Sequence, residues 1–443
     1  MLVAAVAILV ALSLVCAGVT YLSWKNSPQT STGNNPNFVA FQRKYFSAYF
    51  LALVADWLQG PYLYKLYSHY GFLQAQIAVL YVFGLASAVI FGTWAPFIAN
   101  SFGRRNLCIL FTVIYSISCL LKLSRSYLIL ILGRIFGGVA TSLLFSSYEA
   151  WYIHEHINAH DFPREWISVT MRKISVWNGS LAAICGVLAN LLVDGMGAGP
   201  VAPFVFAIPF LLISGIVITL TWSENYGQGE ATFRKACAGG LREIVDNTRL
   251  LLLGAVQSLY ESVLHIVIFL WTPVLSSTHS QPLGVIFSTF MVCIMIGSAS
   301  QGIASRYISS AICLVMAICL AFAACVTLAA SSVQGGEIIC FSALLVYEIS
   351  VGIYFAAVGK LREEILPESH TVSIMNWFRV PLNMIACVVL LLLHDESFRH
   401  GNRLIFEICC VLLCGALFSM GRLLPLVNKK SDIEEPLPSS AVG

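Results

Sequence analysis

Long runs of apolar residues separated by short polar segments dominate the chain. A helix needs about 20 mostly apolar residues to cross the hydrocarbon core of a bilayer. By that criterion we predict thirteen spans, at 2–22, 45–65, 72–94, 107–123, 126–148, 174–194, 201–222, 250–275, 283–303, 308–330, 337–358, 373–393 and 404–425. The span at 45–65 carries Asp56, and Gly60-Pro61 should interrupt its helix. The pattern therefore predicts an all-α polytopic membrane protein.

The polar segment at 223–248 divides the last twelve spans six and six. Transporters are often built from two such repeats, with the substrate site where the repeats meet. We therefore predict five parts: an extra N-terminal transmembrane helix and linker (1–44), a first six-helix bundle (45–222), a cytosolic inter-bundle linker (223–249), a second bundle (250–425) and a disordered cytosolic tail (426–443).

The positions of the basic residues predict the orientation. Loops on the cytosolic side of a membrane carry an excess of Lys and Arg. When the C-terminus is placed in the cytosol, 18 of the 25 Lys and Arg fall in one set of loops and five in the other. The sequence therefore predicts an N-terminus outside the cell and a C-terminus in the cytosol. The first span has no basic residue before it, so we expect an uncleaved helix rather than a signal peptide.

The composition excludes several classes of protein. Of the 443 residues, 58% are hydrophobic and 11% are charged, whereas an average soluble domain carries about 25% charge. A soluble enzyme cannot be the main body, and a net charge of +3 is too small to indicate a nucleic-acid partner. All but one of the 14 Cys lie in apolar runs, so we predict no metal site. We expect no cofactor, and a monomer surrounded by membrane lipid.

Two motifs resemble those of the major facilitator superfamily. The run from Asn100 to Arg105, with Gly103 and Arg104, is similar to the superfamily's Asp-x-x-Gly-Arg-Arg loop after the second of its twelve helices. Arg134 and Gly138 are similar to its Arg-x-x-x-Gly motif in the fourth. Because Asn100 replaces the usual Asp, the charge pairing of this loop with the neighbouring Arg should be lost.

Four longer runs are similar to the animal molybdate-anion transporters within that superfamily. They are the stretches 49–67, 149–156, 269–275 and 376–382, and the resemblance extends from about residue 36 to 425. It implies the major facilitator fold of two six-helix bundles, here with one extra N-terminal helix. It also implies a multi-pass protein of the cell membrane that takes up molybdate.

Charged residues within the spans are the first candidates for a site, because each costs about 2.5–3.5 kcal/mol to insert. Arg134 and Arg379 come from opposite bundles, and two guanidinium groups facing one cavity would balance a dianion. The alternative is that Arg134 forms a structural salt bridge with Asp56 or Glu348. The candidate substrate-binding residues are Arg134, Arg379, Gln59, Tyr62, Asn376 and Asn383.

A second group is predicted to act in ion coupling or gating: Asp56, Lys65, Glu261, His265 and Glu348. An acid such as Asp56 repels an anion unless it is protonated or paired, which indicates a proton carrier or a salt bridge. Gln257, Glu261 and His265 share one helix face at intervals of four. Glu261 and His265 either exchange a proton or form a structural hydrogen-bonded pair.

Energetics favours a driven transporter. A dianion that enters a cell at −100 mV must overcome about 4.6 kcal/mol of electrical free energy. The chain has no Gly-x-x-x-x-Gly-Lys phosphate-binding loop through which ATP could drive this step. We therefore expect a secondary transporter, with protons as one candidate driving ion. Two alternatives stay open. The Tyr, Trp and Gln residues near Asp56 would suit a neutral or organic solute such as a sugar, and a non-transporting receptor or scaffold would need a larger external domain.

Overall fold

The computed structural model describes residues 2–25, 35–226, 233–275, 281–331, 336–367, 370–394 and 402–434. These ranges are helical and contain no strand. The longer helices are α1 (Leu2–Lys25), α2 (Pro36–Gln59), α4 (Gln74–Phe102), α5 (Arg104–Leu121), α6 (Tyr127–His154), α7 (Glu165–Asn190), α8 (Ala202–Thr221), α9 (Phe233–Asp246), α10 (Thr248–Leu275), α11 (Leu283–Ala304), α12 (Ser310–Ser331), α13 (Glu337–Ile365), α14 (Thr371–Leu391) and α16 (Arg403–Glu434). The expectation of an all-α membrane protein is confirmed.

Each predicted span falls on one of these helices. Twelve helices in the described ranges are long and apolar enough to cross a membrane. The thirteenth, α2, is 24 residues long but more polar. It begins where the Asn35 side chain accepts hydrogen bonds from the amides of Asn37 and Phe38. It ends at a short 3-10 turn, Gly60–Tyr62, before the short helix α3 (Leu63–His69), so the predicted interruption at Gly60-Pro61 is confirmed.

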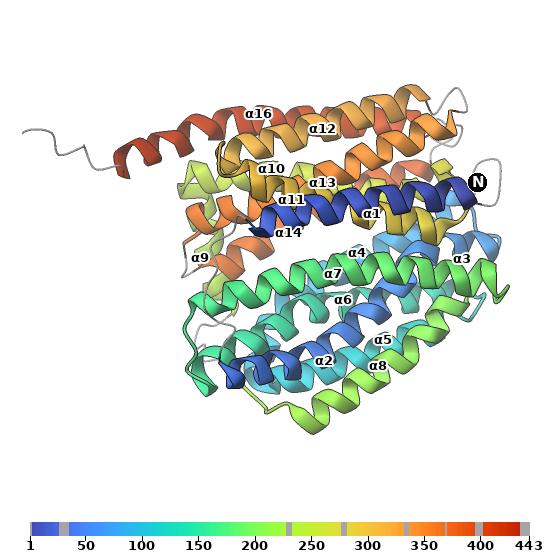
Figure 1. Cartoon of the computed structure of the whole chain (residues 1–443), viewed down its shortest axis with the longest axis horizontal. Helices are drawn as coiled ribbons and strands as arrows, with labels where there is room; N and C mark the ends of the chain where they lie inside the picture. Colours follow the sequence, from blue (N-terminus) through green and yellow to red (C-terminus); the bar gives the residue numbers. More distant parts are fainter. Residues whose placement is uncertain are drawn as a thin grey trace, which may run out of the picture.

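The helices form two bundles with one helix outside them. In Figure 1, α2 and α4 to α8 lie on one side of the molecule, and α10 to α14 with α16 lie on the other. The two sides meet where α7 packs against α11 and where α4 packs against α14. The extra helix α1 packs along α11, where Cys16 is buried against Val292 and Ile296. This is the predicted fold of two six-helix bundles and one additional helix.

Two segments outside the bundles are helical where the sequence predicted a polar linker and a disordered tail. The linker contains α9, which packs on α14, and Trp377 Nε1 donates to the Cys237 carbonyl at 2.9 Å. The tail expected to be disordered from residue 426 is instead helical up to Glu434, because α16 continues past Pro425. Residues 435–443 lie outside the described part of the chain.

The bundles contact each other near the end of the molecule where α3 lies, which we call the α3 end. We call the opposite end, where α9 lies, the α9 end (Figure 1). The Phe269 ring of α10 lies 5.4 Å from the Tyr64 ring and 5.0 Å from the Tyr81 ring, centroid to centroid. The Ser288 hydroxyl of α11 donates to the Ala183 carbonyl of α7 at 2.6 Å. The described contacts thus join the two bundles at the α3 end.

Candidate functional site

A cavity of about 250 Å³ lies within the first bundle, between α2, α4, α5 and α6. Gly84 on α4 and Gly138 on α6 also line it, and Gly138 lets the two helices pack closely, because a Cβ there would overlap the Gly84 carbonyl oxygen. Its wall carries an unusual number of polar and charged groups for a membrane-embedded space. These groups are Asp56, Gln59, Tyr115, Lys122, Arg134 and Thr141.

Arg134 lies in the wall of this cavity. Its Nε donates to the Leu80 carbonyl at 3.2 Å, and its Cζ lies 4.8 Å from the centre of the Tyr81 ring. Among the described residues, no acceptor is bonded to its two terminal nitrogens, and it forms no ion pair with Asp56 or Glu348. The guanidinium group is therefore held by its inner edge, and its outer donors remain available to a ligand.

Lys122, near the end of the span predicted at 107–123, supplies a second cation that the sequence analysis did not single out as a site residue. It follows the last residue of α5, is only 3% exposed, and its Nζ donates to Gln59 Oε1 at 2.8 Å. The same ammonium group lies 5.5 Å from the Tyr115 ring centre and 5.1 Å from that of Phe204. Within the part of the chain that the structure describes, this ammonium group donates to the Gln59 amide and forms no ion pair.

Asp56 is the carboxylate in the cavity wall, and it faces a hydrogen-bond donor. The Tyr115 hydroxyl donates to Asp56 Oδ1 at 2.5 Å. With Lys122 and Arg134 protonated, the wall carries two positive charges against at most one negative charge. In that protonation state the cavity has a net positive charge, which suits an anion with several acceptor oxygens.

A second charged cluster lies in the other bundle, on α10 and α13. Arg362 Nη2 lies 3.0 Å from Glu261 Oε1 in an ion pair, and Arg362 Nε donates to Gln257 Oε1 at 3.1 Å. The Tyr354 hydroxyl also donates to Glu261 Oε1, at 3.1 Å. His265 hydrogen-bonds to the backbone carbonyl of Glu261 on its own helix, at 2.7 Å from Nδ1. The predicted stripe on α10 thus faces Arg362, a residue that the sequence did not single out.

Arg379 is not part of the cavity wall. Its side chain is exposed and points towards α4 of the first bundle, where a Cβ added at Gly92 would lie 3.8 Å from its Nη1. Arg134 packs against Gly84 of the same helix. Eight residues of α-helix rise about 12 Å, so the two arginines face α4 at separate levels.

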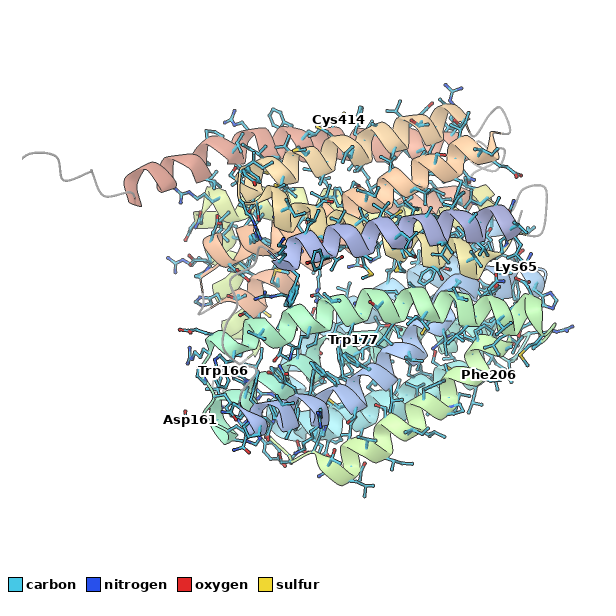
Figure 2. All side chains as sticks on the ribbon, in the orientation of Figure 1. Lys65, Asp161, Trp166, Trp177, Phe206 and Cys414 are labelled. Atoms are coloured by element: carbon cyan, nitrogen blue, oxygen red, sulfur yellow. The ribbon has the colours of Figure 1, made fainter. Side chains whose placement is uncertain are left out.

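Several predicted site residues lie elsewhere. Tyr62 is buried, and its hydroxyl lies 3.3 Å from Asn190 Oδ1 at the end of α7 and 3.1 Å from Asp194 Oδ2 just beyond that helix. Lys65 is exposed at the α3 end, as Figure 2 shows. Asn383 donates to the Arg379 carbonyl of its own helix at 2.8 Å, and Asn376 lies half-buried near the start of α14. The structure does not bring these four residues to the cavity.

Two further acidic residues, Glu348 and Glu407, lie within the predicted spans. Glu348 is buried on α13 with 7% of its surface exposed, and it makes no hydrogen bond or ion pair to the described residues. Glu407 pairs with Arg403 at 2.7 Å on the surface of α16. Neither acid lies in the cavity wall.

The loop motif between α4 and α5 contacts a carboxylate from the segment that follows α8. Gly103 has φ 88°, which favours glycine, and the side chain of Asn100 lies outside the described part. Glu224, which follows α8, accepts from the Arg105 amide at 3.0 Å, and the Arg104 amide donates to the Asn225 carbonyl at 2.9 Å. The segment after α8 thus places a carboxylate at this loop, where it accepts from a backbone amide of α5.

Comparisons with known proteins agree with this architecture. A family model described as sugar transporters with 12 transmembrane segments matches residues 5–348. A molybdate-anion transporter of Xenopus tropicalis is 42% identical over 98% of both chains. Proteins of the same name from Xenopus laevis and Takifugu rubripes are 41% and 40% identical, again over 98% of both chains.

Two solved structures share the fold at low sequence identity. A variant of the nucleoside transporter NupG matches with a TM-score of 0.68 and 12% identity, covering 86% of this chain and 99% of its own. A D-xylose-proton symporter matches with a TM-score of 0.68 and 11% identity, covering 87% and 97%. The fold is therefore that of a major facilitator transporter. Within that superfamily, the chain belongs to the twelve-span family that the model describes, together with its curated relatives, and the resemblance inferred from the motifs is confirmed.

Proposed function

We propose that this protein is a secondary transporter that takes up molybdate through the cell membrane by alternating access. The observation that carries the proposal is the electropositive cavity of the first bundle, where Lys122 and Arg134 face a space of about 250 Å³. Relatives that share 40–42% of the sequence over nearly the whole chain carry the name molybdate-anion transporter. The charge of the cavity and the name of the relatives support the same substrate.

The chemistry of the wall fits a tetrahedral dianion. The outer nitrogens of Arg134 present a planar fork of donors, and Lys122 adds a compact ammonium group. Tyr115 engages Asp56 through a hydrogen bond, which lowers the repulsion between that carboxylate and the anion. Two cations against at most one carboxylate leave a net attraction for molybdate.

A neutral sugar is the second candidate, and one observation favours it. The family model is described as sugar transporters, and Trp57, Gln59 and Tyr115 line the same cavity. Sugar sites combine such aromatic and amide groups. A site for a neutral solute, however, would leave the buried Lys122 and the half-buried Arg134 with Asp56 as the one carboxylate in the wall, and an unbalanced charge is costly in a membrane.

Concentrative uptake of a dianion needs a driving ion, because a potential of 100 mV opposes it by about 4.6 kcal/mol. We propose protons as this ion, with the carboxylates of Asp56 and Glu261 as carriers. The predicted orientation, with the C-terminus in the cytosol, places the α3 end outside the cell. Proteoliposomes with an imposed pH gradient test the coupling: uptake should rise when the outer face is acidic. Uptake that ignores the gradient would remove protons from the mechanism.

The substrate assignment is tested by uptake of labelled molybdate into cells that express the full chain. Lys122→Met and Arg134→Gln should each lower uptake by at least about tenfold, a loss equivalent to 1.4 kcal/mol of binding. Arg422→Gln is the matched control, because Arg422 is exposed on α16, a helix of the other bundle that does not line the cavity. Uptake that persists in both cavity variants and is inhibited by sugars would instead support the neutral solute.

A further inference from the structure

The cluster on α10 and α13 lies at the same level as Arg379. The Ser258 hydroxyl of α10 donates to the Phe378 carbonyl at 3.3 Å, and the Ser262 hydroxyl donates to the Leu382 carbonyl at 2.9 Å. These two bonds bracket Arg379 on α14 and Glu261 on α10.

The two cations of this cluster differ in their partners. Arg362 is engaged by Glu261 and Gln257, and its side chain is 23% exposed. Arg379 makes no hydrogen bond or ion pair to any described residue, and its guanidinium points across the interface between the bundles towards Gly92. Within the described part of the chain, Glu261 therefore pairs with Arg362 and not with Arg379, and the unpaired Arg379 faces the first bundle.

The cluster repeats the chemistry of the cavity in the first bundle. There, a cation donates to the amide of Gln59 and a tyrosine donates to Asp56, both on α2. In the second bundle, a cation donates to the amide of Gln257 and a tyrosine donates to Glu261, both on α10. Gln59 lies at the α3 end of its helix, whereas Gln257 lies in the half of α10 nearer the α9 end. The two sites thus share one arrangement: an amide and an acid on the same helix, a tyrosine that donates to the acid, and a cation that donates to the amide.

We propose that Arg362 and Arg379 form a second oxyanion-binding station, in which Glu261 holds Arg362 until the anion displaces it. The first station is the cavity that contains Lys122 and Arg134. An anion that leaves the first station meets the unpaired Arg379 and then competes with the Glu261 carboxylate for Arg362. This inference rests on the proposed transport of molybdate and adds a second stop between the cavity and the α9 end.

The experiment counts molybdate ions bound to the purified full-length protein by equilibrium dialysis with labelled molybdate in detergent. Wild type should bind two ions per chain. The pair Lys122→Met and Arg134→Gln should remove one ion, and the pair Arg362→Gln and Arg379→Gln should remove the other. Glu261→Gln should tighten the second station by about tenfold, because it removes the competing charge and keeps a hydrogen-bonding side chain of the same length.

The Glu261→Gln result separates a binding station from a structural ion pair. If the ion pair between Arg362 and Glu261 only joins α10 to α13, Glu261→Gln should lower the stability of the protein and leave its affinity for molybdate unchanged. One bound ion that is insensitive to Arg362→Gln and Arg379→Gln would overturn the second station and leave the proposed function intact. Absence of any bound molybdate in wild type would overturn the proposed function and the station together.

Discussion

The position of the Arg134 guanidinium depends on the absence of a Cβ atom at Gly84. A Cβ added at Gly84 would lie 2.5 Å from Arg134 Nη2 and 2.9 Å from its Cζ. Both atoms belong to the flexible end of a side chain, so Gly84→Ala should displace the guanidinium from the cavity wall without unfolding α4. We expect the KM for molybdate uptake to rise by about tenfold, as measured by initial uptake rates.

Gly92→Ala provides the matched control on the same helix. Its Cβ would meet Ser142 at 3.6 Å and Arg379 at 3.8 Å, which are ordinary contact distances. Both substitutions change the helix propensity of α4 equally, so a difference between them reports the displaced arginine. Equal kinetics for the two variants would mean that Arg134 does not contact the substrate.

Single residues also show where sequence reasoning reached its limit. Asp56, Gln59 and Arg134 could be recognised because polar groups inside apolar runs are conspicuous. Lys122 and Arg362 could not, because each lies near the end of a span and was counted with the loops. Whether such a side chain turns inward depends on its partner, here Gln59 for Lys122 and Glu261 for Arg362. Those partners are distant in sequence, and only the fold brings them together.

At the scale of the elements, the start of α5 depends on a carboxylate from the end of α8. Glu224 Oε1 accepts from the Arg105 amide at 3.0 Å, in the first turn of α5. A carboxylate at a helix N-terminus satisfies a free amide and interacts favourably with the helix dipole. Glu224→Ala should therefore reduce the free energy of unfolding by about 1–2 kcal/mol, seen as a lower melting temperature in detergent.

Asp246→Ala is the control for that measurement. Asp246 pairs with Arg242 at 3.5 Å on the exposed face of α9, and an ion pair this exposed contributes little. The two variants remove the same charge, but only Glu224 caps a helix of the bundle. Melting temperatures that fall by the same small amount in both would show that the cap at α5 has no stabilising role.

The elements themselves were largely predictable, because the hydrophobic pattern fixes both their number and their type. Helix ends were less predictable. The span expected at 174–194 begins at Glu165, since the polar residues before it continue the helix beyond the apolar run. For the same reason, α9 and the last turns of α16 were missed: amphipathic or polar helices carry no long apolar signal. Hydropathy identifies the segments that span a membrane, but it does not identify polar or amphipathic helices outside it.

At the scale of the whole molecule, the two bundles approach most closely through backbone at the α3 end. A Cβ added at Gly284 of α11 would overlap the Gly186 carbonyl oxygen of α7. Backbone atoms cannot move aside as a side chain can, so any larger residue forces α7 and α11 apart there. Alternating access requires this contact to form and to break in every cycle. The glycine at 284 therefore permits the closed α3 end.

Gly284→Val should hold the α3 end open. Leu63 lines the cavity just beyond the interruption of α2, so Leu63→Cys, in a background without its reactive cysteines, reports access from that end. In intact cells, a membrane-impermeant maleimide should label Leu63→Cys strongly with Gly284→Val and weakly with native Gly284, while molybdate uptake falls. Gly359→Ala, which adds a Cβ into open space, should leave both labelling and uptake unchanged. Strong labelling with native Gly284 would contradict closure at the α3 end, and absence of labelling in every variant would place that end inside the cell.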